Sequence, residues 1–69
     1  MKLSARNVLK GKILEVKRGQ TTGHVKLDVG GGIVITSSIT MTAVDELKLK
    51  PGDAAYAVIK ASDVIVAID

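Results

Sequence analysis

The chain has no cysteine, one histidine, one proline and one aromatic residue, Tyr56, among its 69 residues. The lack of cysteine excludes disulfides and thiolate metal sites, and a single histidine argues against a histidine-based zinc site within one chain. A domain near this size buries only about 60% of the surface that its unfolded chain exposes, which leaves a thin margin of stability. Because disulfides and such metal sites are missing, self-association is the expected source of further stability.

The residue types also give little support to catalysis. The chain has no cysteine nucleophile, and none of its serines lies in a nucleophile-elbow context. The acidic residues fall mainly on strand surfaces, in turns and at a helix start, where solvated or capping carboxylates are expected. His24 alternates with Lys26 and Asp28 on a polar strand face and is expected to be an exposed imidazole, with a contact near an oligomer axis as the alternative. The sequence therefore indicates a binding protein rather than an enzyme.

The aliphatic content and the net charge indicate which kinds of partner the chain binds. Hydrophobic residues make up 46% of the chain, more than one small core should need, so the surplus is expected in the interfaces of a homo-oligomer. Ten Lys and Arg against seven Asp and Glu give a formal net charge of +3, which favours anionic partners. No apolar run reaches membrane-spanning length, and the N-terminus lacks the apolar region of a signal peptide. We therefore expect a cytoplasmic protein without a membrane partner.

Glycine and proline punctuate the sequence at strand-length intervals, as in all-β folds. Gly11 is expected to mark a bulge or bend in the first strand. Three glycines, Gly30 to Gly32, precede a further strand rather than a helix, so they predict a hairpin turn and not a phosphate-binding loop. We predict five strands, at residues 8–17, 23–29, 33–39, 54–60 and 64–68. The last of these is apolar on both faces and is expected to be buried on both.

A short helix is predicted between the third and fourth strands. Thr42 and Asp45 have the spacing of a capping box, with Thr42 as the N-cap residue. The resulting order, β-β-β-α-β-β, matches the OB-fold, a five-stranded Greek-key barrel. An SH3-like barrel is the alternative, and the position of the helix favours the OB-fold. We therefore predict a single all-β domain over residues 1–69.

Two short segments each combine a cation, a hydroxyl and small neighbours. They are Ser4-Ala5-Arg6-Asn7, before the first strand, and Lys60-Ala61-Ser62, in the turn between the last two strands. Hydrogen bonds from Lys or Arg to an anion are about twice as strong as neutral ones, and hydroxyl and backbone donors can satisfy the remaining lone pairs. These donors suit a tetrahedral dianion, although an ordinary solvated turn is the alternative interpretation of each segment.

These segments resemble the molbindins, the small molybdenum-pterin-binding (Mop) family, and the similarity covers essentially the whole chain. The opening residues 1–12 resemble the Ser-Ala-Arg-Asn start and glycine-containing first strand of that family. Residues 35–40 resemble its Ile-Thr segment before the helix, and residues 47–52 resemble its helix exit. Residues 58–64, Val-Ile-Lys-Ala-Ser-Asp-Val, resemble its closing signature.

The resemblance implies an OB-fold domain that assembles into a homohexamer and binds molybdate or tungstate between subunits. The residues that match oxyanion ligands are Ser4, Arg6, Lys60, Ala61 and Ser62 of one subunit and Thr40 of a neighbour. The metal of such an anion already carries four oxo ligands. The site therefore needs hydrogen-bond donors and positive charge rather than histidine or cysteine, and no organic cofactor is expected.

Three functions remain open at this point. The first is intracellular storage and homeostasis of molybdenum. The second is a basic OB-fold module for single-stranded nucleic acid, which is disfavoured because stacking platforms, each worth about 1–3 kcal/mol per base, are limited to Tyr56. The third is a regulatory subunit that senses the anion and docks onto a transporter or regulator. The absence of a DNA-binding helix pair favours storage over the third.

Overall fold

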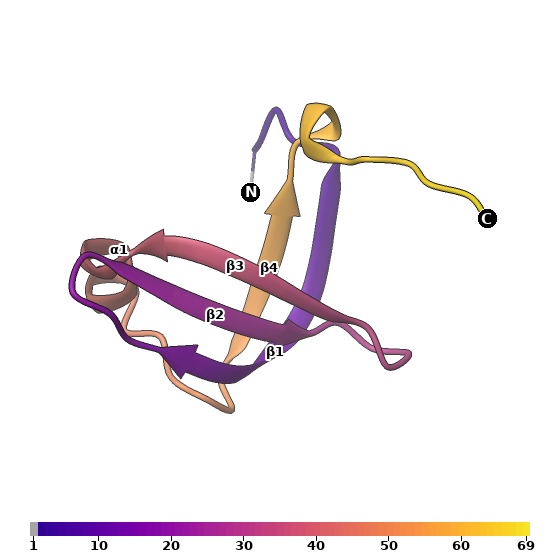
Figure 1. The fold of residues 1–69 in the computed structure, drawn as a ribbon. Coiled ribbons are helices and arrows are strands. Elements are labelled where there is room, and N and C mark those ends of the chain that lie inside the picture. The colour runs from indigo at the N-terminus through magenta and orange to yellow at the C-terminus, as the bar shows by residue number, and fades with distance from the viewer. Residues whose placement is uncertain (1) are drawn as a thin grey trace.

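The computed structural model describes residues 2–69 as four strands, one short helix and one 3₁₀ turn. They are, in chain order, β1 (Asn7–Lys17), β2 (Thr22–Asp28), β3 (Val34–Thr40), α1 (Met41–Glu46), β4 (Ala54–Ile59) and η1 (Ala61–Asp63). The strands form one antiparallel sheet in the order β3-β2-β1-β4, and this sheet curls on itself (Figure 1). The first four predicted strands are confirmed to within one residue at each end.

The prediction of a fifth strand at residues 64–68 is wrong for the single chain. Beyond η1 the chain continues as an exposed segment that leaves the sheet (Figure 1). Ile65, Val66 and Ile68 are 91%, 86% and 95% exposed. The sheet of residues 2–69 is therefore open, with β3 and β4 as its edges, and is not the closed five-stranded barrel that was predicted. The expectation that this segment is buried on both faces is likewise wrong for the described chain.

The core lies inside the curl of the sheet and is small. Ile13 of β1 and Val25 and Leu27 of β2 form its central cluster, each no more than 5% exposed, and Val44 of α1 and Ala57 of β4 are also buried. The predicted alternation along β2 is confirmed, because His24, Lys26 and Asp28 are exposed whereas Val25 and Leu27 are buried. Five buried hydrophobic side chains among the described residues supply limited hydrophobic stabilisation, as expected for a chain of this length.

The first strand bends where two backbones approach closely. A Cβ atom at Gly11 would collide with the backbone carbonyl oxygen of Asp28, so only glycine fits this position. The bulge itself lies further along, between Ile13 and Glu15, where the pairing with β2 shifts by one residue. The bend lets β1 pair with β2 over one part of its length and with β4 over the other.

The N-cap of α1 is Thr40, and the prediction of Thr42 as the cap is wrong. Thr40 has extended dihedral angles (φ −68°, ψ 150°), and its Oγ1 accepts a hydrogen bond of 3.1 Å from the Ala43 N–H. The N–H of Met41 donates to the Thr21 carbonyl oxygen at 2.9 Å. The strand therefore ends at Thr40 and the helix begins at the next residue, which places Thr42 inside the first turn.

The exit from α1 returns the chain to β1. Lys48 lies in the left-handed region with φ 53°, just beyond the last helical turn. Pro51 and Gly52 form a turn that two hydrogen bonds fix to β1. The Gly52 N–H donates to the Ile13 carbonyl oxygen (2.8 Å), and the Ile13 N–H donates to that of Asp53 (2.9 Å). Within residues 2–69, no helix has the length and apolar character needed to span a membrane.

Candidate functional site

The two segments that carry the predicted anion donors leave the sheet at the same end. β1 and β4 are antiparallel, and Asn7 pairs with Ile59 as the last pair of their ladder. Residues 4–6 precede β1 and residues 60–62 follow β4, so both extend from this pair (Figure 1). The side-chain amide of Asn7 donates a hydrogen bond of 3.2 Å to the Ile59 carbonyl oxygen, which ties the two strands together here.

The donor groups at this end are accessible. Ser4, Arg6, Lys60 and Ser62 are all exposed, and none of their side chains forms a hydrogen bond or ion pair with the rest of residues 2–69. Two hydroxyls, one ammonium and one guanidinium are thus available to an acceptor from outside the chain. A tetrahedral oxyanion offers only acceptor oxygens and is complementary to such a set.

Arg6 and Lys60 are the next residues beyond the Asn7–Ile59 pair, one just before β1 and one just after β4. Their charges therefore occur at neighbouring positions of the β1–β4 end. Two cations on adjoining segments repel each other. The ion pairs of the described chain lie elsewhere, Arg18 with Asp45 at 2.6 Å and Lys26 with Glu15 at 3.6 Å. A dianion placed between the two segments would neutralise both cations.

Thr40 lies at the opposite end of the sheet. It pairs with Thr22 in the β2–β3 ladder and caps α1, which Figure 1 shows far from η1 and the N-terminal segment. The structure therefore brings Ser4, Arg6 and Lys60–Ser62 to one end of a chain but does not bring Thr40 to them. A site that uses Thr40 together with the other residues requires a second subunit.

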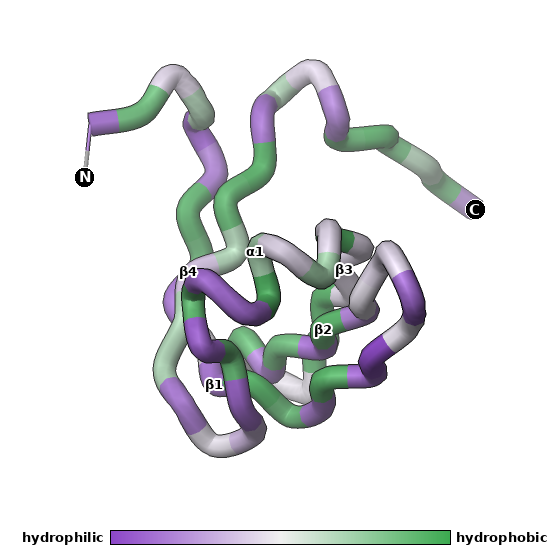
Figure 2. The backbone as a smooth tube through the Cα atoms, turned by 90° about the vertical axis from the view of Figure 1, so that its left-hand side faces the viewer, coloured by the Kyte–Doolittle hydropathy of each residue, from purple (hydrophilic) through white to green (hydrophobic). Residues whose placement is uncertain are grey.

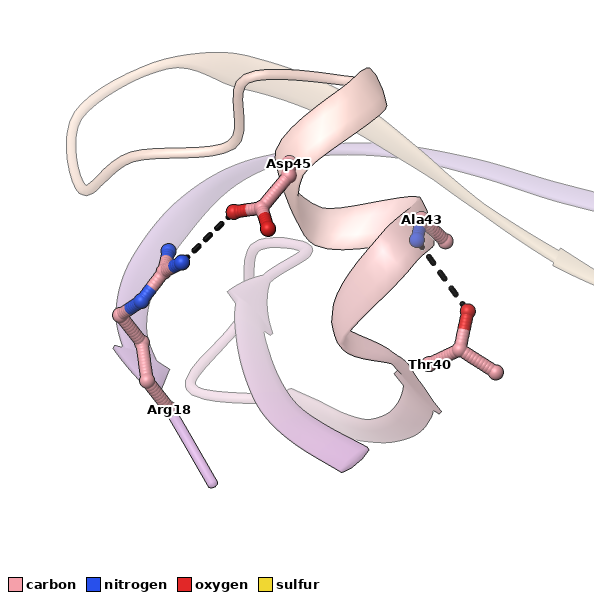
Figure 3. A network of polar contacts seen from close by, with 4 residues as sticks. All are labelled: Arg18, Thr40, Ala43 and Asp45. Atoms are coloured by element: carbon pink, nitrogen blue, oxygen red, sulfur yellow. Dashed lines mark hydrogen bonds and ion pairs between the residues drawn. The ribbon is translucent and has the colours of Figure 1, made fainter. Parts of the chain in front are cut away.

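The surroundings of Thr40 include a contact that the sequence did not reveal. Arg18, in the β1–β2 loop, pairs with Asp45 of α1 at 2.6 Å, and this pair lies on the same helix that Thr40 caps (Figure 3). The two side chains are 58% and 59% exposed, so the pair contributes little stability. Asn7 was also missed as a structural link, although it belongs to the Ser-Ala-Arg-Asn motif that was singled out.

An apolar hollow separates the two free edges of the sheet. A cavity of 410 Å³ is lined by the core residues Ile13, Val25 and Leu27 together with Ile39 of β3 and Val58 of β4, among others. A second hollow, of 450 Å³, lies between residues 35–37 of β3 and residues 56–59 of β4. The unpaired edges of β3 and β4 thus face a common, largely apolar gap.

No group of three His, Cys, Asp or Glu side chains that could hold a metal ion occurs in the described part of the chain.

Comparison with known proteins gives the family. Residues 3–66 match the TOBE domain. A probable molybdenum-pterin-binding protein of Haemophilus influenzae is 46% identical to the chain over 69 residues, which cover 100% of both proteins. The chain belongs to the molybdenum-pterin-binding (Mop) family of TOBE-domain proteins. This confirms the resemblance stated from the sequence motifs.

Solved structures show the same fold for the Mop chain. MopII from Clostridium pasteurianum superposes with a TM-score of 0.91 at 43% identity, over 97% of this chain and 100% of that one. A molybdate-bound form of ModG, described as a cytoplasmic molybdate-binding protein, has a TM-score of 0.90 at 51% identity, over 94% of this chain and 46% of ModG. The curled four-stranded sheet with one short helix is therefore a Mop fold.

Proposed function

We propose that this Mop chain is not an enzyme and binds molybdate or tungstate, for molybdenum storage and homeostasis, at sites shared between the subunits of a homo-oligomer. The observation that carries the proposal is the placement of Ser4, Arg6, Lys60 and Ser62 on adjoining segments, exposed and without protein partners. The relatives named as molybdenum-pterin-binding proteins and the molybdate-bound form of ModG support this ligand class.

Each part of the proposed site has a chemical role. Arg6 and Lys60 supply positive charge and charge-assisted hydrogen bonds, and Ser4 and Ser62 supply neutral hydroxyl donors. Ala61 adds little bulk, so the backbone N–H groups of its turn can approach the anion. A dianion is costly to desolvate unless all its oxygens are paired. Because the donors of one chain lie on one side only, a neighbouring subunit would complete the set.

Thr40 of that neighbour is the proposed contribution from the second subunit. Its Oγ1 already accepts the Ala43 N–H, while its hydroxyl hydrogen is free to be donated. The N-cap role holds the side chain in one orientation and leaves it exposed at the end of β3. The same hydroxyl can therefore cap the helix and donate to an oxyanion held by another chain.

Assembly of the homo-oligomer, with a hexamer as the proposed form, is supported by the C-terminal segment. Residues 64–68 are apolar and exposed, and Figure 2 shows them leaving the sheet as a mostly hydrophobic tail. The gap between β3 and β4 is apolar and has free edges to which an extended segment can add by strand pairing. Exchange of this segment between copies would bury both surfaces and close the sheet.

The proposal includes a cytoplasmic location and no organic cofactor. The description of ModG as cytoplasmic supports the location. The donor set at the β1–β4 end suits an inorganic anion on its own, because it consists of cations and hydroxyls around small side chains.

Isothermal titration with molybdate and tungstate, with sulfate and phosphate as controls, tests the function. We expect saturable binding of molybdate or tungstate and a weak response to sulfate. Lys60→Ala should weaken binding by about 10- to 100-fold, the effect of losing one hydrogen bond from a charged group. The matched control is Lys10→Ala, an exposed cation of β1 that pairs with Tyr56 rather than with a second cation. No heat with either anion on folded protein would refute the proposal and would favour the nucleic-acid alternative.

A further inference from the structure

We infer that η1 is the hinge of the exchanged C-terminal segment, and that repulsion between Arg6 and Lys60 makes this hinge respond to a bound oxyanion. The inference rests on the proposed function, since it takes Arg6 and Lys60 as anion-binding residues and residues 64–68 as the exchanged strand. It adds a form of regulation: the anion controls how firmly the subunits hold one another.

The connection between β4 and the tail is short and lightly held. Lys60 precedes η1 in an extended conformation (φ −66°, ψ 143°), and Val64 follows it in another (φ −91°, ψ 122°). Two backbone hydrogen bonds form the turn, from Asp63 N–H to the Lys60 carbonyl oxygen (2.9 Å) and from Val64 N–H to that of Ala61 (3.3 Å). No side chain caps the turn, and none of its residues is buried. The direction of the tail thus depends on one exposed turn.

The same turn contains half of the proposed anion site. Lys60 and Ser62 lie within or beside η1, and the tail begins two residues after Ser62. An anion that accepts hydrogen bonds from both residues and from Arg6 would join the turn to the N-terminal segment. Opening the hinge would then break those hydrogen bonds, so release of the exchanged strand would become slower.

Without an anion, the electrostatics act in the opposite direction. Arg6 and Lys60 occupy neighbouring positions beyond the Asn7–Ile59 pair, and neither has an ion-pair partner within residues 2–69. Both lie just outside the paired ladder, and repulsion between two like charges on adjoining segments would favour an open turn over one held against the N-terminal segment. A dianion reverses this interaction. Because both side chains are exposed, the repulsion should weaken as salt is raised.

Subunit exchange of the full chain measures the hinge directly. We would mix ¹⁵N-labelled and unlabelled protein and follow mixed oligomers by native mass spectrometry, with saturating molybdate, with sulfate at equal ionic strength, and with neither. We expect molybdate to slow exchange by about tenfold or more, the lower end for a hydrogen bond from a charged group. If the protein is monomeric without anion and assembles when molybdate is added, the result also supports the inference, because the subunits then hold together only when the anion is bound.

A charge variant tests the repulsion without any anion. Arg6→Gln should exchange several-fold more slowly than the unmodified chain in low salt, and the difference should shrink at high salt. Lys10→Gln is the control, because it removes one cation from β1 at a position paired with Tyr56. Its exchange rate should match that of the unmodified chain.

The outcomes separate the inference from the proposed function. Calorimetric binding of molybdate with an unchanged exchange rate would overturn the hinge inference and leave the binding function in place. No calorimetric binding would overturn the function and the response to anion together. The Arg6→Gln variant and the unmodified chain could also exchange at equal rates in low salt without anion. That result would overturn the claim that repulsion between Arg6 and Lys60 opens the hinge, whatever the calorimetry shows.

Discussion

The side-chain amide of Asn7 donates a hydrogen bond of 3.2 Å to the backbone carbonyl oxygen of Ile59, at the last pair of the β1–β4 ladder. This bond links the strand that follows Ser4 and Arg6 to the strand that precedes Lys60. Asn7→Leu, which has a similar shape and no donor, should destabilise the fold by about 1 kcal/mol in urea unfolding. It should also weaken molybdate binding several-fold in calorimetry. Unchanged affinity would show that the two segments need no such link.

Replacing the helix cap tests Thr40 in both of its roles. Thr40→Val should cost about 0.5–2 kcal/mol of stability, because the Ala43 N–H loses its acceptor, whereas Thr40→Ser should retain most of it. Thr42→Val is the matched control, since Thr42 lies exposed inside the helix and should change stability by no more than about 0.5 kcal/mol. Chemical denaturation measures all three. If Thr40→Val binds molybdate as tightly as Thr40→Ser does, the hydroxyl is not an anion donor.

Gly23 of β2 holds α1 against the sheet through its lack of a side chain. A Cβ atom there would lie 3.0 Å from both Met41 Sδ and Val44 Cγ2. The Met41 side chain is flexible and can move aside, but Val44 is 1% exposed and is enclosed by its neighbours. Gly23→Ala should therefore cost about 1–3 kcal/mol through overpacking, measured by thermal or urea unfolding.

A double variant provides the check on this packing. Val44→Ala alone removes core volume and should destabilise the fold, but in the Gly23→Ala background it removes the clash. The double variant should thus be more stable than the sum of the two single effects predicts. Strict additivity would mean that the new methyl group does not contact Val44.

Lys48 is the one non-glycine residue with positive φ among those the structure describes. Its position beyond the end of α1 is one where glycine is usual, because a Cβ is strained in the left-handed region. Lys48→Gly should stabilise the protein by about 0.5–1 kcal/mol. Lys48→Ala removes the same charge without relieving the strain and should give no such gain. Melting temperatures of the two variants at equal protein concentration decide the point.

Much of the sheet could be predicted from local patterns. The alternation around Val25 and Leu27 identifies a half-buried strand, because a period of two places successive side chains on opposite faces. The glycine and proline turns mark where strands end. These features depend only on residues a few positions apart in the chain, so they can be predicted from a single sequence.

The remaining features depend on partners distant in the chain. Arg18 and Asp45 are 27 residues apart and meet only because the curled sheet brings the β1–β2 loop to α1. The choice of Thr40 over Thr42 as cap is set by where the ladder with β2 ends, which no local pattern specifies. The apolar residues 64–68 predicted a buried strand, whereas they lie exposed outside the sheet, because the apolar pattern does not specify a strand to pair with. For the candidate site, the family resemblance named the residues and assigned Thr40 to a neighbouring subunit, but the distance of Thr40 from the others within one chain follows only from the fold.

The turn at Gly30 to Gly32 has a further consequence. All three residues have positive φ (94°, 62° and 77°), and a Cβ atom at any of them would meet nothing within 4 Å. Any penalty for a side chain here thus arises from chirality rather than from size. L-alanine at Gly31 would be strained by about 1–2 kcal/mol despite the open space. D-alanine, whose preferred φ has the opposite sign, would adopt the native backbone without strain. The turn therefore discriminates by the chirality of the residue and not by the size of its side chain.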